Sequence, residues 1–159
     1  MEYSVQSWSP WTEADKELLE NVQRRAIRMV SGLEGRTYEE RLNELGLTTL
    51  EARRERGDMI EVYKILTGKE DVDPGAWFTL AQDGRQAAET RISKGVLNLK
   101  KPAMVKKLKL RENFFSVRVV DPWNNLPDVV KKAKTVNTFK NRYDKFISGQ
   151  EIRDDDEPT

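Results

Sequence analysis

The stretch Phe114-Phe-Ser-Val-Arg-Val-Val-Asp-Pro-Trp-Asn-Asn-Leu-Pro127 is the densest apolar cluster of a sequence in which 35% of the residues are charged. Burial of apolar surface drives folding, so a core can be anchored here. The core residues that we expect from this stretch are Phe114, Phe115, Trp123 and Leu126. The run just before it, from Arg91 to Arg111, holds eight basic residues and no acidic one. A core anchor beside a basic segment is typical of a nucleic-acid-binding module.

The composition restricts the chemistry that the chain can perform. Cysteine and histidine are both absent from its 159 residues. Disulfides, thiolate metal sites and a histidine general base are therefore excluded. The chain has no apolar run long enough for a membrane span and no signal-peptide pattern. We expect an intracellular protein of the nucleus or cytoplasm, without a cofactor, a metal or a membrane partner.

Charge is segregated along the chain although the net charge is only +1. The first twenty residues contain five acids against one lysine, and the last nine contain five acids against one arginine. The basic run between Arg91 and Arg111 is unopposed. Such a distribution indicates where a charged partner binds, which the net charge cannot do.

The first part of the chain predicts three helices in an antiparallel helical bundle. Thr12 is a typical N-cap, and the helix that follows should close at Gly32. Apolar residues at spacings of three and four predict its buried face: Leu18, Leu19, Val22, Ala26, Met29 and Val30. Its other face carries Gln23, Arg24, Arg25 and Arg28. Capping boxes at Thr37 and Thr48 predict a short helix ending at Gly46 and a longer one reaching about Thr67.

The second part predicts short helices and a basic hairpin. Asp73-Pro74 begins a helix through Leu80. Partial alternation over 96–101 and 105–110 predicts two short antiparallel strands, although Ala103–Leu110 fits the start of a helix nearly as well. A helix over 112–123 should follow, which Pro122 either kinks at its end or terminates a turn early. Thr135 should cap a last helix that ends at Gly149. The predicted fold is mainly α, with a thumb-like bundle over 1–68, a basic module over 69–147 and a disordered acidic tail over 148–159.

No catalytic motif is present: the chain has no glycine-rich phosphate loop, HExxH or GxSxG. The aspartates 154–156 lie in the polar tail, where we expect a solvated run and not a metal site. The basic residues remain, because lysine and arginine neutralise phosphates. The candidate contacts in the run are Lys100, Lys101, Lys106, Lys107 and Lys109. The alternative is that these lysines keep an edge strand soluble.

Several stretches taken together resemble the region after the palm in reverse transcriptases of non-LTR retrotransposons (LINE-type, jockey- and CR1-like). Their order and spacing are more specific than any one of them. They are YSVQSWSP at 3–10, LENVQRRAIRM at 19–29, YEERLNELGLTTLEARRERGDM at 38–59, FFSVRVV at 114–120, WNNLP at 123–127 and FKNR at 139–142. The segment 82–106 departs from the arginine-rich pattern usual before FFS.

The resemblance implies a thumb-like region that grips template and primer, which can be RNA, DNA or their hybrid. The match to the family's QRRA-type motif implies contacts from Gln23, Arg24, Arg25 and Arg28. The catalytic palm of such a polymerase would lie before residue 1, so we expect no enzymatic activity from this chain. A second hypothesis is a protein-interaction module or homodimer in which Tyr3, Trp8 and Trp11 bind the partner.

Overall fold

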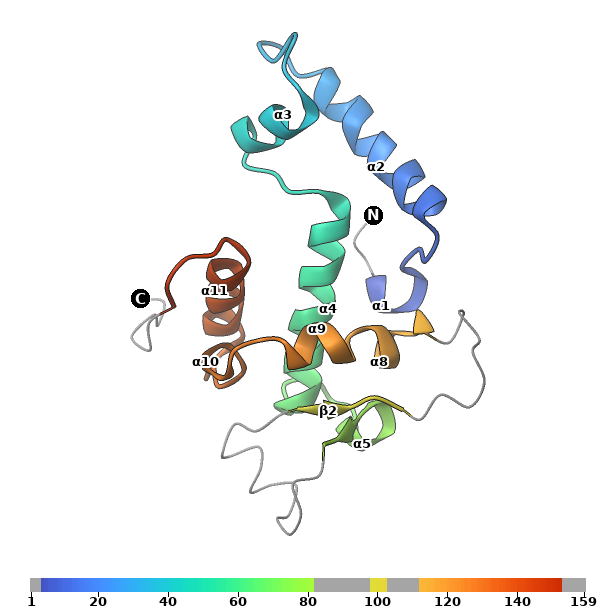
Figure 1. The fold of residues 1–159 in the computed structure, drawn as a ribbon, viewed down its shortest axis with the longest axis vertical. Helices are drawn as coiled ribbons and strands as arrows, with labels where there is room; N and C mark the ends of the chain where they lie inside the picture. The colour runs from blue at the N-terminus through green and yellow to red at the C-terminus, as the bar shows by residue number, and fades with distance from the viewer. Residues whose placement is uncertain (1–3, 82–97, 103–111, 153–159) are drawn as a thin grey trace. The chain divides into compact units, whose positions relative to one another are not determined.

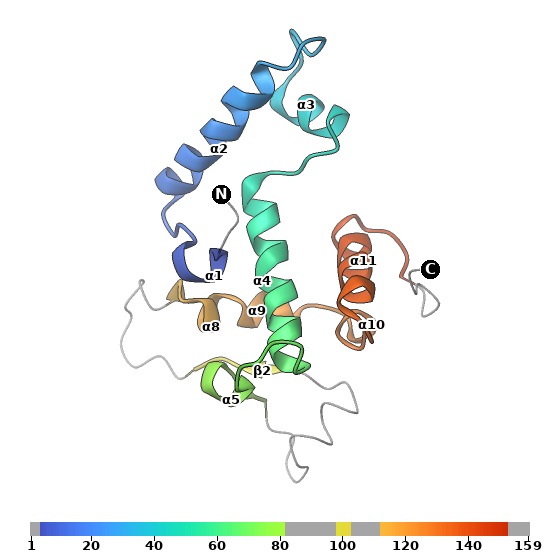
Figure 2. The ribbon, with the colours of Figure 1, turned by 180° about the vertical axis from the view of Figure 1, so that it is seen from behind.

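The computed structural model describes residues 4–81, 98–102 and 112–152 (Figures 1 and 2). These residues are mainly helical with one two-stranded antiparallel sheet, which confirms the predicted fold class. The elements are α1 (Val5–Trp8), α2 (Glu13–Arg28), α3 (Tyr38–Glu44), α4 (Leu50–Leu66), α5 (Pro74–Trp77), β1 (Thr79–Leu80), β2 (Leu99–Lys100), α8 (Phe115–Arg118), α9 (Val120–Asn124), α10 (Asp128–Lys131) and α11 (Val136–Ile147). Among the described helices, none combines the length and the apolar content that a bilayer crossing requires.

The chain forms two compact units, Met1–Gly57 and Asp58–Thr159. Their boundary falls inside α4, eleven residues before the Gly68 boundary that the sequence predicts. The reason is that Met59, Val62 and Tyr63 belong to the hydrophobic core of the second unit. Helix α4 therefore contributes its first half to one unit and its second half to the other.

Local capping chemistry sets the helix ends of the first unit. Thr12 Oγ1 accepts a hydrogen bond from the Asp15 backbone N–H at 3.1 Å, and the predicted capping box of Thr37 is complete. After α3, Gly46 has a φ of 62° and the Leu47 N–H donates to the Leu42 carbonyl at 2.8 Å, as a Schellman ending requires.

The cap of α4 lies one residue later than predicted. The Ala52 N–H donates to Thr49 Oγ1 at 3.2 Å, so Thr49 and not Thr48 begins the helix. The carbonyl of Thr48 instead accepts a hydrogen bond from Gln23 at 3.0 Å, which fixes this residue as part of the connection between helices.

The buried face of α2 is not the predicted one. Glu20, Gln23 and Ile27 are buried, whereas Leu18, Val22 and Met29 are 66%, 50% and 85% exposed. Apolar periodicity gave the wrong face because two of the three residues that α2 buries, Glu20 and Gln23, are held by hydrogen bonds to α3 and α4. The apolar stripe of α2 consequently faces outward.

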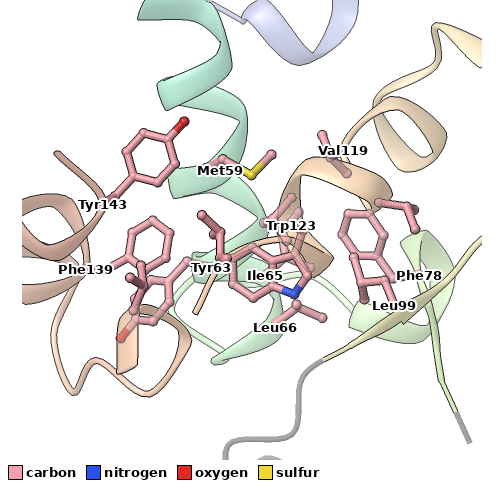
Figure 3. Close-up of a cluster of buried hydrophobic side chains, with 14 of the residues drawn as sticks. Met59, Tyr63, Ile65, Leu66, Phe78, Leu99, Val119, Trp123, Phe139 and Tyr143 are labelled. Carbon is pink, nitrogen blue, oxygen red and sulfur yellow. The ribbon is translucent and has the colours of Figure 1, made fainter. Parts of the chain in front are cut away.

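The second unit has an aromatic core, drawn in Figure 3. Tyr63 of α4 stacks on Phe139 of α11 with ring centroids 4.5 Å apart, and Trp123 of α9 lies 6.0 Å from the same ring. Phe115, Trp123 and Leu126 are buried, as predicted. Phe114 is 54% exposed, so its assignment to the core was wrong. It precedes α8 in an extended conformation, so its side chain is not in register with the helix face that buries Phe115.

The sheet joins segments other than those predicted. Thr79 pairs with Lys100 and Leu80 with Leu99, so Thr79–Leu80 is a strand and α5 ends at Trp77. The predicted partner strand, 105–110, lies outside the described residues. The helix predicted over 112–123 is split into α8 and α9, because Pro122 has no N–H to donate to the Arg118 carbonyl.

Candidate nucleic-acid interface

Gln23 is turned inward and holds α2 to the two helices that follow. Its Nε2 donates to Tyr38 Oη and to the Thr48 carbonyl, both at 3.0 Å. Its Oε1 accepts a hydrogen bond from Arg53. Both ends of the amide are therefore occupied within the protein, and the side chain is only 8% exposed. This geometry makes Gln23 a structural residue rather than a phosphate contact.

Glu20, one turn before Gln23, is a second buried polar residue of α2. Its carboxylate accepts a hydrogen bond from the Leu50 N–H at 3.0 Å and another from Tyr38 Oη. Burial and the bond to Glu20 raise the pKa of Tyr38, because both disfavour its phenolate form. Sequence reasoning missed this pair; the i, i+3 spacing of Glu20 and Gln23 was the available signal.

Arg24 makes its contacts within its own unit. Its guanidinium pairs with Glu17, donates to Asn21 Oδ1 at 3.3 Å and lies 4.9 Å from the centre of the Tyr38 ring. These contacts orient the side chain along the α2–α3 contact. A phosphate would have to compete with Glu17 for it.

Arg25 and Arg28 are the outward members of the QRRA-type motif. Both are exposed in the last turn of α2, and neither makes a hydrogen bond or ion pair with any described residue. The negative end of the helix macrodipole favours cations there, so the two guanidinium groups are held at the surface without a neutralising carboxylate. The structure thus divides the four predicted contacts into an inward pair and an outward pair.

Only two residues of the predicted lysine set can be placed. Lys100 is exposed on β2 and has no partner among the described residues, while Lys101 Nζ lies 2.5 Å from Asp121 Oδ2. Lys106, Lys107 and Lys109 lie outside the described residues.

The strand that carries Lys100 is clamped by the WNNLP segment, a function that the sequence did not indicate. The Leu99 N–H donates to Asn124 Oδ1 at 2.8 Å, and Asn124 Nδ2 donates to the Leu99 carbonyl at 2.9 Å. The amide side chain thus bonds to the second edge of β2 as a neighbouring strand would. This clamp positions the exposed Lys100 side chain.

Lys131 is a basic residue that the structure withdraws from solvent. It is 3% exposed, and its Nζ donates to Asn98 Oδ1 at 2.9 Å and to the Asn124 carbonyl at 3.2 Å. Burial lowers the pKa of this amine, because lost hydration disfavours its charged form more than the Asp128 carboxylate favours it. Lys131 supports the Asn124 clamp and is not available to a phosphate.

The aromatic residues proposed for partner binding are only partly described. Trp11 is 47% exposed. Tyr3 and the side chain of Trp8 lie outside the described part of the chain. Within the residues that the structure describes, no group of three or more acidic side chains is arranged to hold a metal ion.

Comparisons with known proteins add no relative: no family model, no curated protein sequence and no solved structure matches the chain. The similarity to LINE-type reverse transcriptases therefore rests on the motifs quoted from the sequence, and it stays a prediction.

Proposed function

We propose that the chain is a non-catalytic nucleic-acid-binding module, derived from the C-terminal region of a LINE-type reverse transcriptase. The observation that carries the proposal is the pair Arg25 and Arg28, which is exposed at the end of α2 without a partner among the described residues. The two residues belong to the QRRA-type motif that carries part of the family resemblance. An arginine held this way can bind a phosphate without first breaking an ion pair.

The interface acts on the nucleic-acid backbone and not on the bases. Arg25 and Arg28 are three residues apart, so they lie on neighbouring parts of one helix surface and can reach phosphates along one strand. The inward pair, Gln23 and Arg24, fixes the orientation of the helix that presents them. Affinity should consequently be tolerant of sequence and steeply dependent on salt.

The test is fluorescence-anisotropy binding to single-stranded RNA, duplex DNA and a primer–template hybrid over a salt series. The R25A/R28A variant is compared with K69A/K132A, which removes the same charge from exposed lysines of the second unit. If both arginines contact phosphates, the slope of log K against log salt falls by about 1.8 for duplex DNA and by about 1.4 for a single strand.

Two results would overturn the proposal. The first is the absence of binding to all three ligands at low salt. The second is an equal loss of affinity in R25A/R28A and K69A/K132A, which would indicate diffuse charge and no interface on α2. Incubation with primed template and nucleotides should give no primer extension, since we propose no catalytic step for this chain.

A further inference from the structure

We propose that α2 also binds a second copy of this chain, as an antiparallel helix pair. The basis is its outward stripe, whose positions are spaced alternately by four and three residues: Trp11, Asp15, Leu18, Val22, Arg25 and Met29. Trp11 lies just outside the helix, before the N-cap Thr12, and Met29 caps the other end. All six residues are exposed. Such spacing is the heptad pattern by which one helix packs along another.

The stripe is not the face by which α2 packs in its own unit. The residues that α2 buries, Glu20, Gln23 and Ile27, lie on the opposite side of the helix. The stripe includes side chains as exposed as Leu18 at 66% and Met29 at 85%. A row of large apolar side chains on one helix, flanked by charges, is typical of a surface that another protein covers.

The arrangement of charge along the stripe selects the partner and its direction. Asp15 stands near one end and Arg25 near the other. When two copies of α2 run antiparallel about a twofold axis at the level of residue 20, each Asp15 faces the Arg25 of the other copy. In the same register Leu18 faces Val22, and Met29 lies at the level of the segment that precedes the helix of the other copy, where Trp11 stands. The Asp15–Arg25 and Leu18–Val22 pairings are obtained with one register, so the stripe is complementary to itself.

The same charges exclude the parallel alternative. In a parallel pair in register, Asp15 would face Asp15 and Arg25 would face Arg25, which places like charges together at two levels. Like charges brought together in an interface are strongly unfavourable, and this repulsion determines pairing direction in coiled coils. The partner that fits is therefore a second α2 in the opposite direction.

Dimerisation and nucleic-acid binding would share one residue. Arg25 lies within the stripe and would pair with Asp15 of the other copy, whereas Arg28 lies beside the stripe and stays outside the pair. Nucleic acid should therefore compete with the second copy for Arg25 and leave the contribution of Arg28 unchanged.

Charge reversal tests the pairing by sedimentation velocity over a concentration series. D15R and R25D should each weaken self-association by at least about tenfold, because each variant places like charges opposite one another. Mixed in equal amounts, they should form a heterodimer, since every facing pair then has opposite charges. Failure of the wild-type chain to self-associate, or of the mixture to associate, would overturn the proposal.

Disulfide trapping tests direction and register, and it does not depend on the charge variants. The chain contains no cysteine, so L18C and V22C each introduce one thiol at an exposed site. Oxidising an equal mixture of L18C, carrying a size tag, and V22C should give the mixed disulfide at far more than twice the yield of either symmetric one. Predominance of the symmetric products would indicate a parallel pair, and a mixed yield only twice that of each symmetric product would indicate random collision; both results contradict the proposal.

Discussion

Replacing Asn124 with alanine should destabilise the second unit by about 2–4 kcal/mol. Its side chain makes two hydrogen bonds to the backbone of Leu99, at 2.8 and 2.9 Å, and Leu99 is only 2% exposed. Alanine would leave a buried N–H and a buried carbonyl without these partners, and each such group costs about 1–3 kcal/mol. The estimate lies below the top of the summed range because water can reach part of the vacated space.

Asn125 provides the matched control within the same WNNLP segment. It is exposed, and its side chain makes no hydrogen bond with the described residues. N125A should therefore change stability by no more than about 0.5 kcal/mol. The free energy of unfolding is measured by urea titration with circular dichroism, and protection of the Leu99 amide is followed by hydrogen exchange. Equal stability of N124A and N125A, or a Leu99 amide that exchanges freely in the wild type, would refute the conclusion that the Asn124 side chain holds the backbone of Leu99.

Three further predictions follow from single contacts. D58A should lower the free energy of unfolding in urea by about 3 kcal/mol, because it leaves the partly buried guanidinium of Arg118 without its carboxylate partner. That guanidinium donates to both Asp58 oxygens, at 2.9 and 3.0 Å. Additive effects of the two substitutions in the double variant D58A/R118M would contradict this pairing. The Thr37 backbone N–H at the N-cap of α3 lowers the pKa of Glu40 below 4.5. The stabilisation that the Glu40 carboxylate provides is therefore present above pH 4.5, and it is lost as the pH falls through the lowered pKa of the folded state. The Tm difference between wild type and E40Q should accordingly be present at pH 7 and shrink as the pH falls below 4.5. Y63F should cost about 1–2 kcal/mol by removing the 2.7 Å bond from Tyr63 Oη to the Ala133 carbonyl, and thermal unfolding with no change would exclude that bond.

Features determined by neighbouring residues could be predicted from the sequence. The caps at Thr12, Thr37 and Thr135 are correct because a side-chain oxygen three residues before a free N–H is a local arrangement. The core positions Phe115 and Trp123 were predicted correctly because large aromatic side chains are usually buried on folding.

Features determined by partners distant in the sequence could not be predicted. The pattern of α2 predicts the wrong buried face because it contains no sign of Tyr38, fifteen residues from Gln23, or of the Leu50 N–H, thirty residues from Glu20. For the same reason the sequence could not show that Arg25, and not Arg24, is the better candidate for a phosphate contact. The difference depends on the Tyr38 ring, which lies against Arg24. The pairing of β2 with Thr79–Leu80 is likewise a non-local choice.

The polar interior around Glu20 and Gln23 has a consequence for temperature. Exposure of apolar surface raises the heat capacity of the unfolded state, whereas exposure of polar surface lowers it. The first unit therefore gains less heat capacity per residue on unfolding than the second, whose core is built on Tyr63, Trp123 and Phe139. Its stability curve is the flatter of the two. Cooling should therefore weaken the aromatic core of the second unit more than the attachment of α2, in which the hydrogen bonds of Glu20 and Gln23 act beside the buried Ile27.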